Sequence, residues 1–332
     1  MWWTWVVLII LIIILAIFLF FQAKAHHSIF QPDRKHKSKP KYRYENIWLP
    51  INTIDGSNYK SSCHPSNIKL KDSKHTKFIH CWYFNSYPKR KTVLFLHGNT
   101  GNISYRDYVI EICHKFKLNL LLVDYRGYGK SDSSCSITGV YNDSLSAYYY
   151  LRKHGIVYKD IIIWGESLGG APAVYLASKV PCGKLILFST FSNLKDLIEY
   201  YPKPTNTTKM LSKYIDYLTT PIPNNTRLTK VKCPVMIVHS KNDDLIGYSC
   251  AKSLYRAVQH PRKHILTIKG NHSAPNMKQK HLETLLNFCT VDSGLEKGED
   301  LTFTLNQLEI IADEYQRRKH DSYDSRNGTR IH

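Results

Sequence analysis

The chain has 332 residues, of which 43% are hydrophobic and 22% are charged, and this ordinary composition excludes a mostly disordered chain, a collagen and a protein with many membrane spans. Its eight cysteines form no CxxC pair, which argues against a zinc ribbon or a thioredoxin-like site. The net charge of +20 suits an acidic membrane surface or solubility, and no zinc-finger, RRM or basic-zipper pattern indicates nucleic acid.

The first segment of the chain is apolar. Residues 2–21 contain no charged side chain, and a helix of this length spans about 30 Å, the thickness of a bilayer core. A cleaved signal peptide is the alternative, because Ala23-Lys24-Ala25 resembles a cleavage site. However, the apolar run is longer than a signal core and no basic residue precedes it. We therefore predict one transmembrane anchor at residues 1–23.

A basic, proline-containing segment follows at residues 24–44, with seven Lys or Arg residues and one acid, Asp33. We predict a linker that is attracted to anionic lipid. Because the positive charges follow the span, the domain is expected on the cytoplasmic side. Six Asn-x-Ser/Thr sequons argue for the opposite side, at Asn102, Asn142, Asn206, Asn224, Asn271 and Asn327. We favour the cytoplasmic side slightly, since glycans on Asn102 and Asn271 would obstruct access to the candidate site described below.

The main domain is predicted at residues 45–290. Residues 45–84 indicate short strands with turns at 55–56 and 71–73. Short apolar runs without alternation, typical of strands buried on both faces, follow at 92–97, 118–124, 161–164, 184–188, 234–239 and 264–268. Helical spacing is found at 141–153, 168–179, 248–259 and 275–288.

This alternation predicts an α/β fold with a mostly parallel central sheet, helices on both faces, and functional loops at the carboxyl ends of the strands. Residues 192–230 interrupt the alternation with Tyr and Pro residues, and we expect a small cap there. Residues 291–332 are expected to form one helix, at 305–317, and a polar tail. A Cys63–Cys81 disulfide is conceivable only for a lumenal domain.

One motif indicates nucleophilic chemistry. The strand at 161–164 leads into GESLGG at residues 165–170 and then into a helix. This is G-x-S-x-G in a strand–turn–helix context, in which Ser167 occupies a sharp turn that requires glycine at 165 and 169. The helix N-terminus favours negative charge that develops beside the serine. We predict Ser167 as the nucleophile.

A serine nucleophile needs a base and an orienting carboxylate. The strand that ends at residue 239 is followed by two acids, and we favour Asp243 over Asp244 as the orienting acid. The next strand leads through a glycine turn to His272, which we predict as the base. The loop HGNTGN at 97–102 follows another strand, so we assign the oxyanion hole to the backbone N–H groups of Asn99 and Leu168. His97 is expected to brace this loop.

These motifs, together with DYRGYGKS at 124–131, HSKNDD at 239–244 and GNHS at 270–273, resemble those of the α/β-hydrolases. The chain is most similar to a membrane-anchored branch with an HGNAGN loop. This branch includes the α/β-hydrolase-domain protein thirteen and the seventeen-type protein depalmitoylases, and it is grouped with serine aminopeptidase-like domains. Here Thr100 replaces the alanine of the loop, Gly247 stands where proline is common, and Asn271-His272-Ser273 replaces Gly-His-Asn.

The resemblance covers residues 45–290 and implies Ser167, Asp243 and His272 as nucleophile, acid and base, without a metal or an organic cofactor. We therefore expect a single-pass, membrane-anchored serine hydrolase that cleaves an acyl ester or thioester in a lipid or a lipidated protein. A peptidase of the same fold is the alternative within the enzymes. A non-catalytic membrane adaptor that retains the fold is the alternative of another class, and it would not need an intact triad.

Overall fold

The computed structural model describes residues 2–51, 77–199, 206, 213, 215 and 221–291. Several predicted features lie outside these residues and stay predictions: the turns at 55–56 and 71–73, the helix at 305–317, and nearly all of the cap between 200 and 220. Cys63 is also outside them, whereas Cys81 is completely buried in the sheet.

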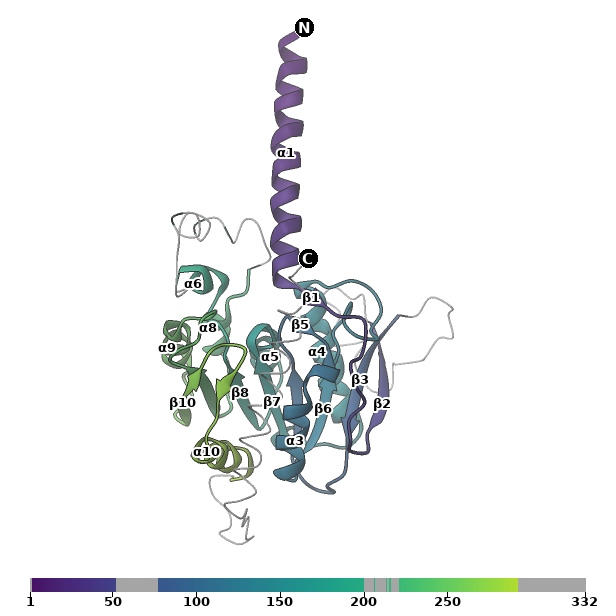
Figure 1. Ribbon diagram of the computed structural model, residues 1–332, viewed down its shortest axis with the longest axis vertical. Helices are drawn as coiled ribbons and strands as arrows, with labels where there is room; N and C mark the ends of the chain where they lie inside the picture. Colours follow the sequence, from purple (N-terminus) through teal and green to yellow (C-terminus); the bar gives the residue numbers. More distant parts are fainter. Residues whose placement is uncertain are drawn as a thin grey trace, which may run out of the picture.

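A nine-stranded sheet forms the centre of the domain, in the order β11-β10-β9-β8-β7-β4-β6-β3-β2 (Figure 1). The run from β10 to β6 is parallel, while β2, β3 and β11 pair antiparallel at its two edges. The strands are β2 (Glu45–Pro50), β3 (Phe78–Phe84), β4 (Thr92–Leu96), β6 (Asn119–Val123), β7 (Ile161–Glu166), β8 (Lys184–Phe188), β9 (Val235–Ser240), β10 (Lys263–Gly270) and β11 (Pro275–Asn276). The predicted mostly parallel sheet is therefore confirmed.

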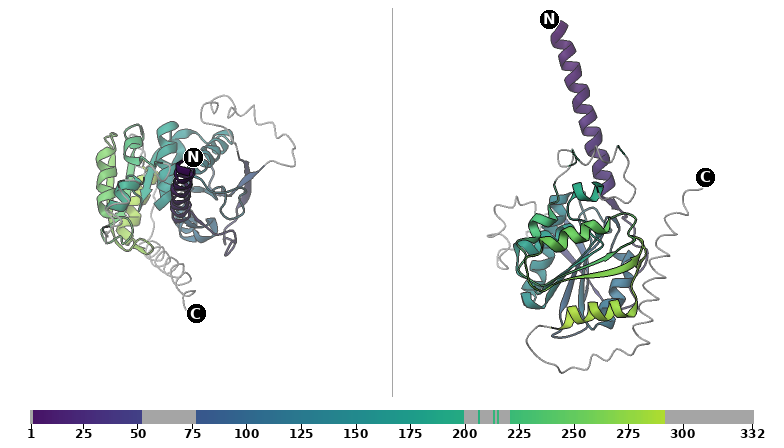
Figure 2. Two further views of the ribbon diagram at one scale, coloured as in Figure 1. Left: turned by 90° about the horizontal axis from the view of Figure 1, so that it is seen from above. Right: turned by 90° about the vertical axis from the view of Figure 1, so that its left-hand side faces the viewer.

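The apolar runs form strands because both of their faces are covered. Every residue of β4, β6, β7, β8 and β9 is buried, as expected for the interior of a parallel sheet. Helices α4 (Ile137–Lys153), α5 (Gly170–Lys179) and α9 (Tyr248–Ala257) add side chains such as Leu145, Val174 and Leu254 to the core on one face. Helices α3 (Asp107–Lys115) and α10 (Gln279–Thr290) lie on the other face (Figure 2). Their side chains, such as Ile112 and Leu285, join the core there.

The described helices are α1 (Trp2–Ile29), α3 (Asp107–Lys115), α4 (Ile137–Lys153), α5 (Gly170–Lys179), α6 (Leu194–Glu199), α8 (Asn224–Leu228), α9 (Tyr248–Ala257) and α10 (Gln279–Thr290). Helix α4 begins four residues before the prediction, because the Ser136 side chain caps it by accepting the Gly139 N–H at 3.0 Å. Helix α10 begins later than predicted, because Pro275 and Asn276 pair back onto β10 instead. Helix α3 was not predicted.

Helix α1 projects from the domain and meets it beside β1 (Gln31–Pro32) and β5 (Thr100–Gly101) (Figure 1). It includes residues 2–23 of the predicted anchor and continues to Ile29. Several side chains of α1 lie outside the described part of the chain, and over the residues that are described no helix is long and apolar enough to cross a membrane. The transmembrane part of the prediction is therefore not confirmed.

The strand order reverses between β4 and β7. From β4 the chain passes to β6 on one side, and it then returns to β7 on the other side. Loops that leave the carboxyl ends of such neighbouring strands diverge and leave a crevice, where parallel α/β sheets bind ligands. Leu96 is paired with Gly165, so the loop after β4 and the turn after β7 begin side by side. The two predicted parts of the site, HGNTGN and GESLGG, meet at this point.

Candidate active site

Ser167 lies at the tight turn between β7 and α5. Its φ of 53° is in the left-handed region, which is unfavourable for a residue with a side chain and is common where a nucleophile is presented. A Cβ atom on Gly165 would collide with the Gly169 carbonyl oxygen, and one on Gly169 would collide with the Leu96 carbonyl oxygen. The requirement for glycine at both positions is therefore confirmed, and it arises from close backbone approach.

The structure brings the three predicted triad residues into one chain of contacts. Ser167 Oγ lies 3.1 Å from His272 Nε2, and His272 Nδ1 lies 2.8 Å from Asp243 Oδ2. The sheet explains this arrangement, because β9 and β10 pair in parallel with Ser240 opposite Ile268. The loops that carry Asp243 and His272 consequently leave the same edge of the sheet as Ser167.

Asp243, not Asp244, faces the imidazole ring. The other oxygen of Asp243, Oδ1, accepts the backbone N–H groups of Leu245 at 3.0 Å and Ile246 at 2.7 Å. Burial by itself raises the pKa of the Asp243 carboxyl, but the hydrogen bond and charge of His272 and the neighbouring His239 lower it, and the resulting pKa is below its ordinary value. The carboxylate is thus ionised at neutral pH.

Asp244 contributes in a different way. Its Oδ1 accepts the backbone N–H of His272 at 2.8 Å, so this side chain positions the loop and not the ring. His239 is a further neighbour of Asp243 that was not predicted. Its Nε2 donates to the Ile246 carbonyl at 2.8 Å and lies 3.5 Å from Asp243 Oδ2, and burial lowers its pKa.

The loop after β4 lies against the serine. A Cβ atom added to Gly98 would lie 3.3 Å from Ser167 Cβ and 3.8 Å from Ser167 Oγ. The predicted oxyanion donors, the N–H groups of Asn99 and Leu168, belong to the two turns that meet here. His97 is completely buried, and its Nδ1 lies 2.7 Å from the Gly98 carbonyl oxygen. Its contacts are those of a side chain that braces the loop.

Burial, together with the nearby charge of Arg106, lowers the pKa of His97 to about 4. In the unfolded chain a histidine has a pKa near 6.5, so below this pH the unfolded state binds a proton that the folded state excludes. We expect the free energy of unfolding to fall by about 2 kcal/mol between pH 7 and pH 5 from this residue. Urea unfolding of the wild type and of His97→Asn at both pH values measures this change in the free energy of unfolding. If the free energy falls equally in the two proteins, His97 is not its source.

An ion pair joins the serine turn to the loop after β4. Arg106 Nε lies 3.4 Å from Glu166 Oε2, and the guanidinium also donates to the Thr100 carbonyl at 2.9 Å. The Tyr108 hydroxyl donates to the other oxygen of Glu166. This connection was not predicted, because Arg106 and Glu166 are 60 residues apart, Arg106 belongs to no motif, and Glu166 occupies a variable position of G-x-S-x-G.

The segment predicted as a linker is packed on the same loop. β1 pairs in parallel with β5, with Gln31 N–H donating to the Asn99 carbonyl at 3.0 Å and Asp33 N–H donating to the Gly101 carbonyl at 3.1 Å. The Asn102 amide donates to the backbone carbonyls of Asp33 and Lys35 at 3.0 and 2.8 Å. The chain immediately after α1 is therefore part of the scaffold of the predicted oxyanion loop.

The Asn99 carbonyl has a second donor, the Tyr128 hydroxyl at 2.7 Å. Because this bond holds the oxyanion loop at the peptide unit that follows Asn99, we expect Tyr128→Phe to lower kcat about two- to tenfold with little change in KM, the effect of one lost hydrogen bond. Steady-state kinetics on an acyl ester would measure this. Tyr158→Phe, at a tyrosine that is 38% exposed, is the control, and equal activity of both variants would exclude the bracing role.

Two of the sequons are inaccessible. Asn102 is completely buried with both amide protons used by backbone carbonyls, and Asn224 is completely buried with its amide donated to the Phe191 carbonyl at 2.9 Å. A glycan on either side chain is incompatible with this fold. The argument from sequons for the lumenal side is correspondingly weaker.

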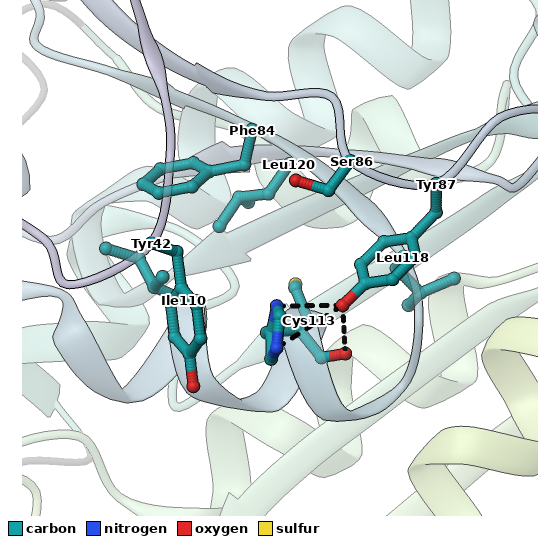
Figure 3. A pocket seen from close by; sticks show the side chains of 9 residues that line it. Tyr42, Phe84, Ser86, Tyr87, Ile110, Cys113, Leu118 and Leu120 are labelled. Carbon is teal, nitrogen blue, oxygen red and sulfur yellow. Dashed lines mark hydrogen bonds between the residues drawn. The ribbon is translucent and has the colours of Figure 1, made fainter.

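A small apolar cleft between α3 and the end of β3 does not belong to the site (Figure 3). It is lined by residues such as Tyr42, Phe84 and Ile110, and the Tyr87 hydroxyl at its rim lies 2.8 Å from His114 Nδ1. None of the predicted catalytic residues lines it.

Comparisons with known proteins show which family models and which proteins this chain resembles. A family model described as the alpha/beta hydrolase fold matches residues 91–208, and one described as uncharacterised protein family UPF0227 matches residues 151–290. Alpha/beta hydrolase domain-containing protein 17C of Xenopus laevis is 28% identical over 216 residues, which cover 64% of this chain and 66% of that protein. The human 17B protein is 27% identical over 215 residues, 64% of this chain and 71% of that protein.

Solved structures show the same fold at lower identity. The Pyrococcus furiosus esterase Pf2001 matches with a TM-score of 0.58 and 16% identity, over 78% of this chain and 96% of the esterase. Est1E from Butyrivibrio proteoclasticus, solved with ferulic acid, matches with a TM-score of 0.50 and 20% identity, over 64% of this chain and 93% of that one.

The matched family model and the solved structures show that the chain has the α/β-hydrolase fold. The chain belongs to the α/β-hydrolase superfamily. The match spans about two thirds of the length of the seventeen-type relatives, and the likeness to the thirteen-type protein stays a prediction.

Proposed function

We propose that this protein is a serine hydrolase that cleaves an acyl ester or thioester through an acyl-enzyme. The observation that carries the proposal is the continuous chain from Ser167 Oγ through His272 to the ionised Asp243, with separations of 3.1 and 2.8 Å. This chain supports a general-base mechanism, because each group is within reach of the proton that it has to move or orient.

In the proposed reaction Ser167 Oγ attacks the acyl carbonyl carbon while its proton passes to His272 Nε2. The Nδ1–H group of His272 stays hydrogen-bonded to Asp243, whose negative charge stabilises the imidazolium. The tetrahedral intermediate collapses, the alkoxide or thiolate leaves with the proton from Nε2, and Ser167 carries the acyl group. Water then attacks the ester with His272 as base, and the carboxylic acid is released.

The oxyanion of each tetrahedral intermediate would be bound by the N–H groups of Asn99 and Leu168. A donor of this kind contributes about 2.7–4 kcal/mol to transition-state binding. Support for Asn99 comes from the peptide unit that carries its N–H group, because the Gly98 carbonyl oxygen of this unit lies 2.7 Å from His97 Nδ1. The next peptide unit is also held, since the Asn99 carbonyl accepts Gln31 N–H and the Tyr128 hydroxyl. A peptide unit held in this way needs little reorganisation when the charge develops.

We further propose that α1 anchors the protein in a membrane with the domain on the cytoplasmic side. Trp2, Trp3 and Phe20 are each more than 60% exposed, and an apolar helix surface of this kind favours an apolar surrounding. The basic residues between 24 and 43 suit anionic lipid. A site held close to a bilayer favours acyl lipids or lipidated proteins as substrates. The similarity to the seventeen-type α/β-hydrolase domain proteins and to the esterases supports the assignment as a hydrolase.

Labelling with a fluorophosphonate tests the catalytic proposal. The reagent phosphonylates only an activated serine, so we expect labelling of the wild type, no labelling of Ser167→Ala, and full labelling of Ser178→Ala, whose serine lies on α5 away from the turn. Acyl-ester, acyl-thioester and peptide substrates would then separate a lipase or thioesterase from a peptidase. A folded wild type that is not labelled would refute the hydrolase and favour the adaptor.

Membrane attachment is tested separately. We expect the full chain to remain in the pellet after alkaline carbonate extraction and its domain to be digested when protease is added to sealed vesicles. Release by carbonate would contradict the anchor. Protection from the protease would contradict the cytoplasmic side.

A further inference from the structure

Three titratable side chains from distant parts of the chain converge beside the predicted oxyanion loop. His36 comes from the segment after α1, His80 from β3, and Asp124 from the end of β6. His36 Nε2 lies 3.1 Å from Asp124 Oδ2, and His80 Nδ1 lies 3.7 Å from the same oxygen. His80 and Asp124 are completely buried, and 12% of the His36 side chain is exposed. The proposed catalytic reaction uses none of these groups.

The hydrogen bonds of His80 leave one nitrogen without a partner. Its Nε2 lies 2.8 Å from Asn46 Oδ1, which can only accept, so Nε2 carries the proton. In the neutral ring Nδ1 is then a bare lone pair, and this buried nitrogen has no hydrogen-bond partner. It faces a carboxylate oxygen, which is also an acceptor. Two buried acceptors that face each other are compensated by a positive charge between them, either a second proton on the ring or a metal ion.

The separations suit a metal ion. Zn²⁺ binds histidine nitrogen and carboxylate oxygen at about 2.0–2.2 Å, which places ligand atoms of a tetrahedral site about 3.3 Å apart. The separations of 3.1 and 3.7 Å lie on either side of this value, and the three ligand atoms are all within 4.8 Å of one another. The Asn46 oxygen would act as the outer partner that fixes the tautomer of His80, as is common for histidines that bind metals.

We propose that His36 Nε2, His80 Nδ1 and Asp124 Oδ2 bind a divalent transition-metal ion of the Zn²⁺ class. The partly exposed edge of His36 gives the ion a route from solvent and leaves a position for water. The ion holds the segment after α1 against the domain, because this segment supplies His36 whereas the domain supplies His80 and Asp124. Asp124 Oδ1 also accepts the Ile103 N–H at 2.8 Å, so the same carboxylate connects the metal to the loop beside Ser167.

Zinc binding to the full-length protein, purified without a histidine tag and treated with a chelator, tests the proposal. We expect one tight Zn²⁺ equivalent in competition with a chromophoric chelator, and a melting temperature that rises with Zn²⁺ because the ion binds the folded state. Co²⁺ in its place should give the intense visible absorption of a site with fewer than six ligands. None of these readouts depends on catalytic activity, so they are independent of the proposed hydrolase.

Variants distinguish this site from the other histidines of the chain. We expect His36→Gln and His80→Gln each to weaken the tight site at least tenfold and to abolish the thermal shift. His264→Gln, at an exposed histidine on β10, is the matched control and should behave as the wild type. His36→Gln leaves the β1–β5 pairing intact, so loss of folding does not obscure the result. Absence of a tight equivalent, or equal affinity in His36→Gln and the wild type, would overturn the proposal and indicate that His80 is instead doubly protonated.

Discussion

Ser167→Ala is expected to lower kcat for acyl-ester hydrolysis by about 10⁶-fold, because no acyl-enzyme can form without the hydroxyl group. The substitution removes one oxygen atom from a residue whose backbone is in the left-handed region, and alanine tolerates this conformation about as well as serine does. We therefore expect KM and the melting temperature to change little. Burst-phase kinetics would show the loss directly as the absence of a rapid first release of alcohol.

The comparison with Ser178→Ala separates this effect from a general loss of stability. Ser178 donates to the Tyr175 carbonyl at 2.7 Å within α5, and its substitution should leave kcat within a fewfold of the wild type. A Ser167→Ala protein that retains more than about a thousandth of the wild-type rate would contradict its role as nucleophile.

Asp243→Asn is expected to lower kcat by about 10⁴-fold, for a reason that the hydrogen bonds of this residue make specific. The backbone N–H groups of Leu245 and Ile246 both donate to Oδ1, so the amide oxygen of an asparagine has to stay at that position. The amide NH₂ group is then directed at His272 Nδ1 and donates to it. The ring proton moves to Nε2, which can no longer accept the proton of Ser167.

Asp244→Asn is the matched control for this prediction. The asparagine oxygen can still accept the His272 N–H that Asp244 Oδ1 accepts at 2.8 Å, so activity should stay within a fewfold of the wild type. Steady-state kinetics of the two variants, with circular dichroism to check folding, makes the comparison. Similar losses in both variants would mean that Asp243 only supports the loop, in contradiction to the proposed triad.

Local patterns in the sequence were sufficient for the fold and for the candidate triad. Strands buried on both faces are continuous apolar runs, and the strand at 184–188 agrees with β8 residue for residue. The serine turn has a signature of its own, because only glycine fits beside the Leu96 and Gly169 carbonyls. Asp243 and His272 could be chosen because the ends of parallel strands meet at one edge of the sheet, so position along the chain implies proximity.

The segment between α1 and β2 shows where such reasoning fails. Its charge and its proline indicated a linker, yet Gln31 and Asp33 pair with the loop after β4, about 70 residues away. Backbone hydrogen bonds of this kind require only a complementary edge, and they leave no signal in side-chain composition. The ion pair of Arg106 with Glu166 and the cluster of His36, His80 and Asp124 were not predicted either, since nothing within the motifs of Glu166 and Asp124 indicates which distant side chains they contact.

The sequence by itself thus determined the alternation of buried strands and helices, the serine turn, the candidate base and the pair of acids from which Asp243 was favoured, because these depend on hydrophobic periodicity and on backbone geometry over a few residues. Only the tertiary structure decided that Asp243 and not Asp244 faces the ring, that the segment after α1 supports the loop beside Ser167, and that two histidines share Asp124. These features arise from contacts between residues far apart in the chain, where packing of the whole domain sets the distances.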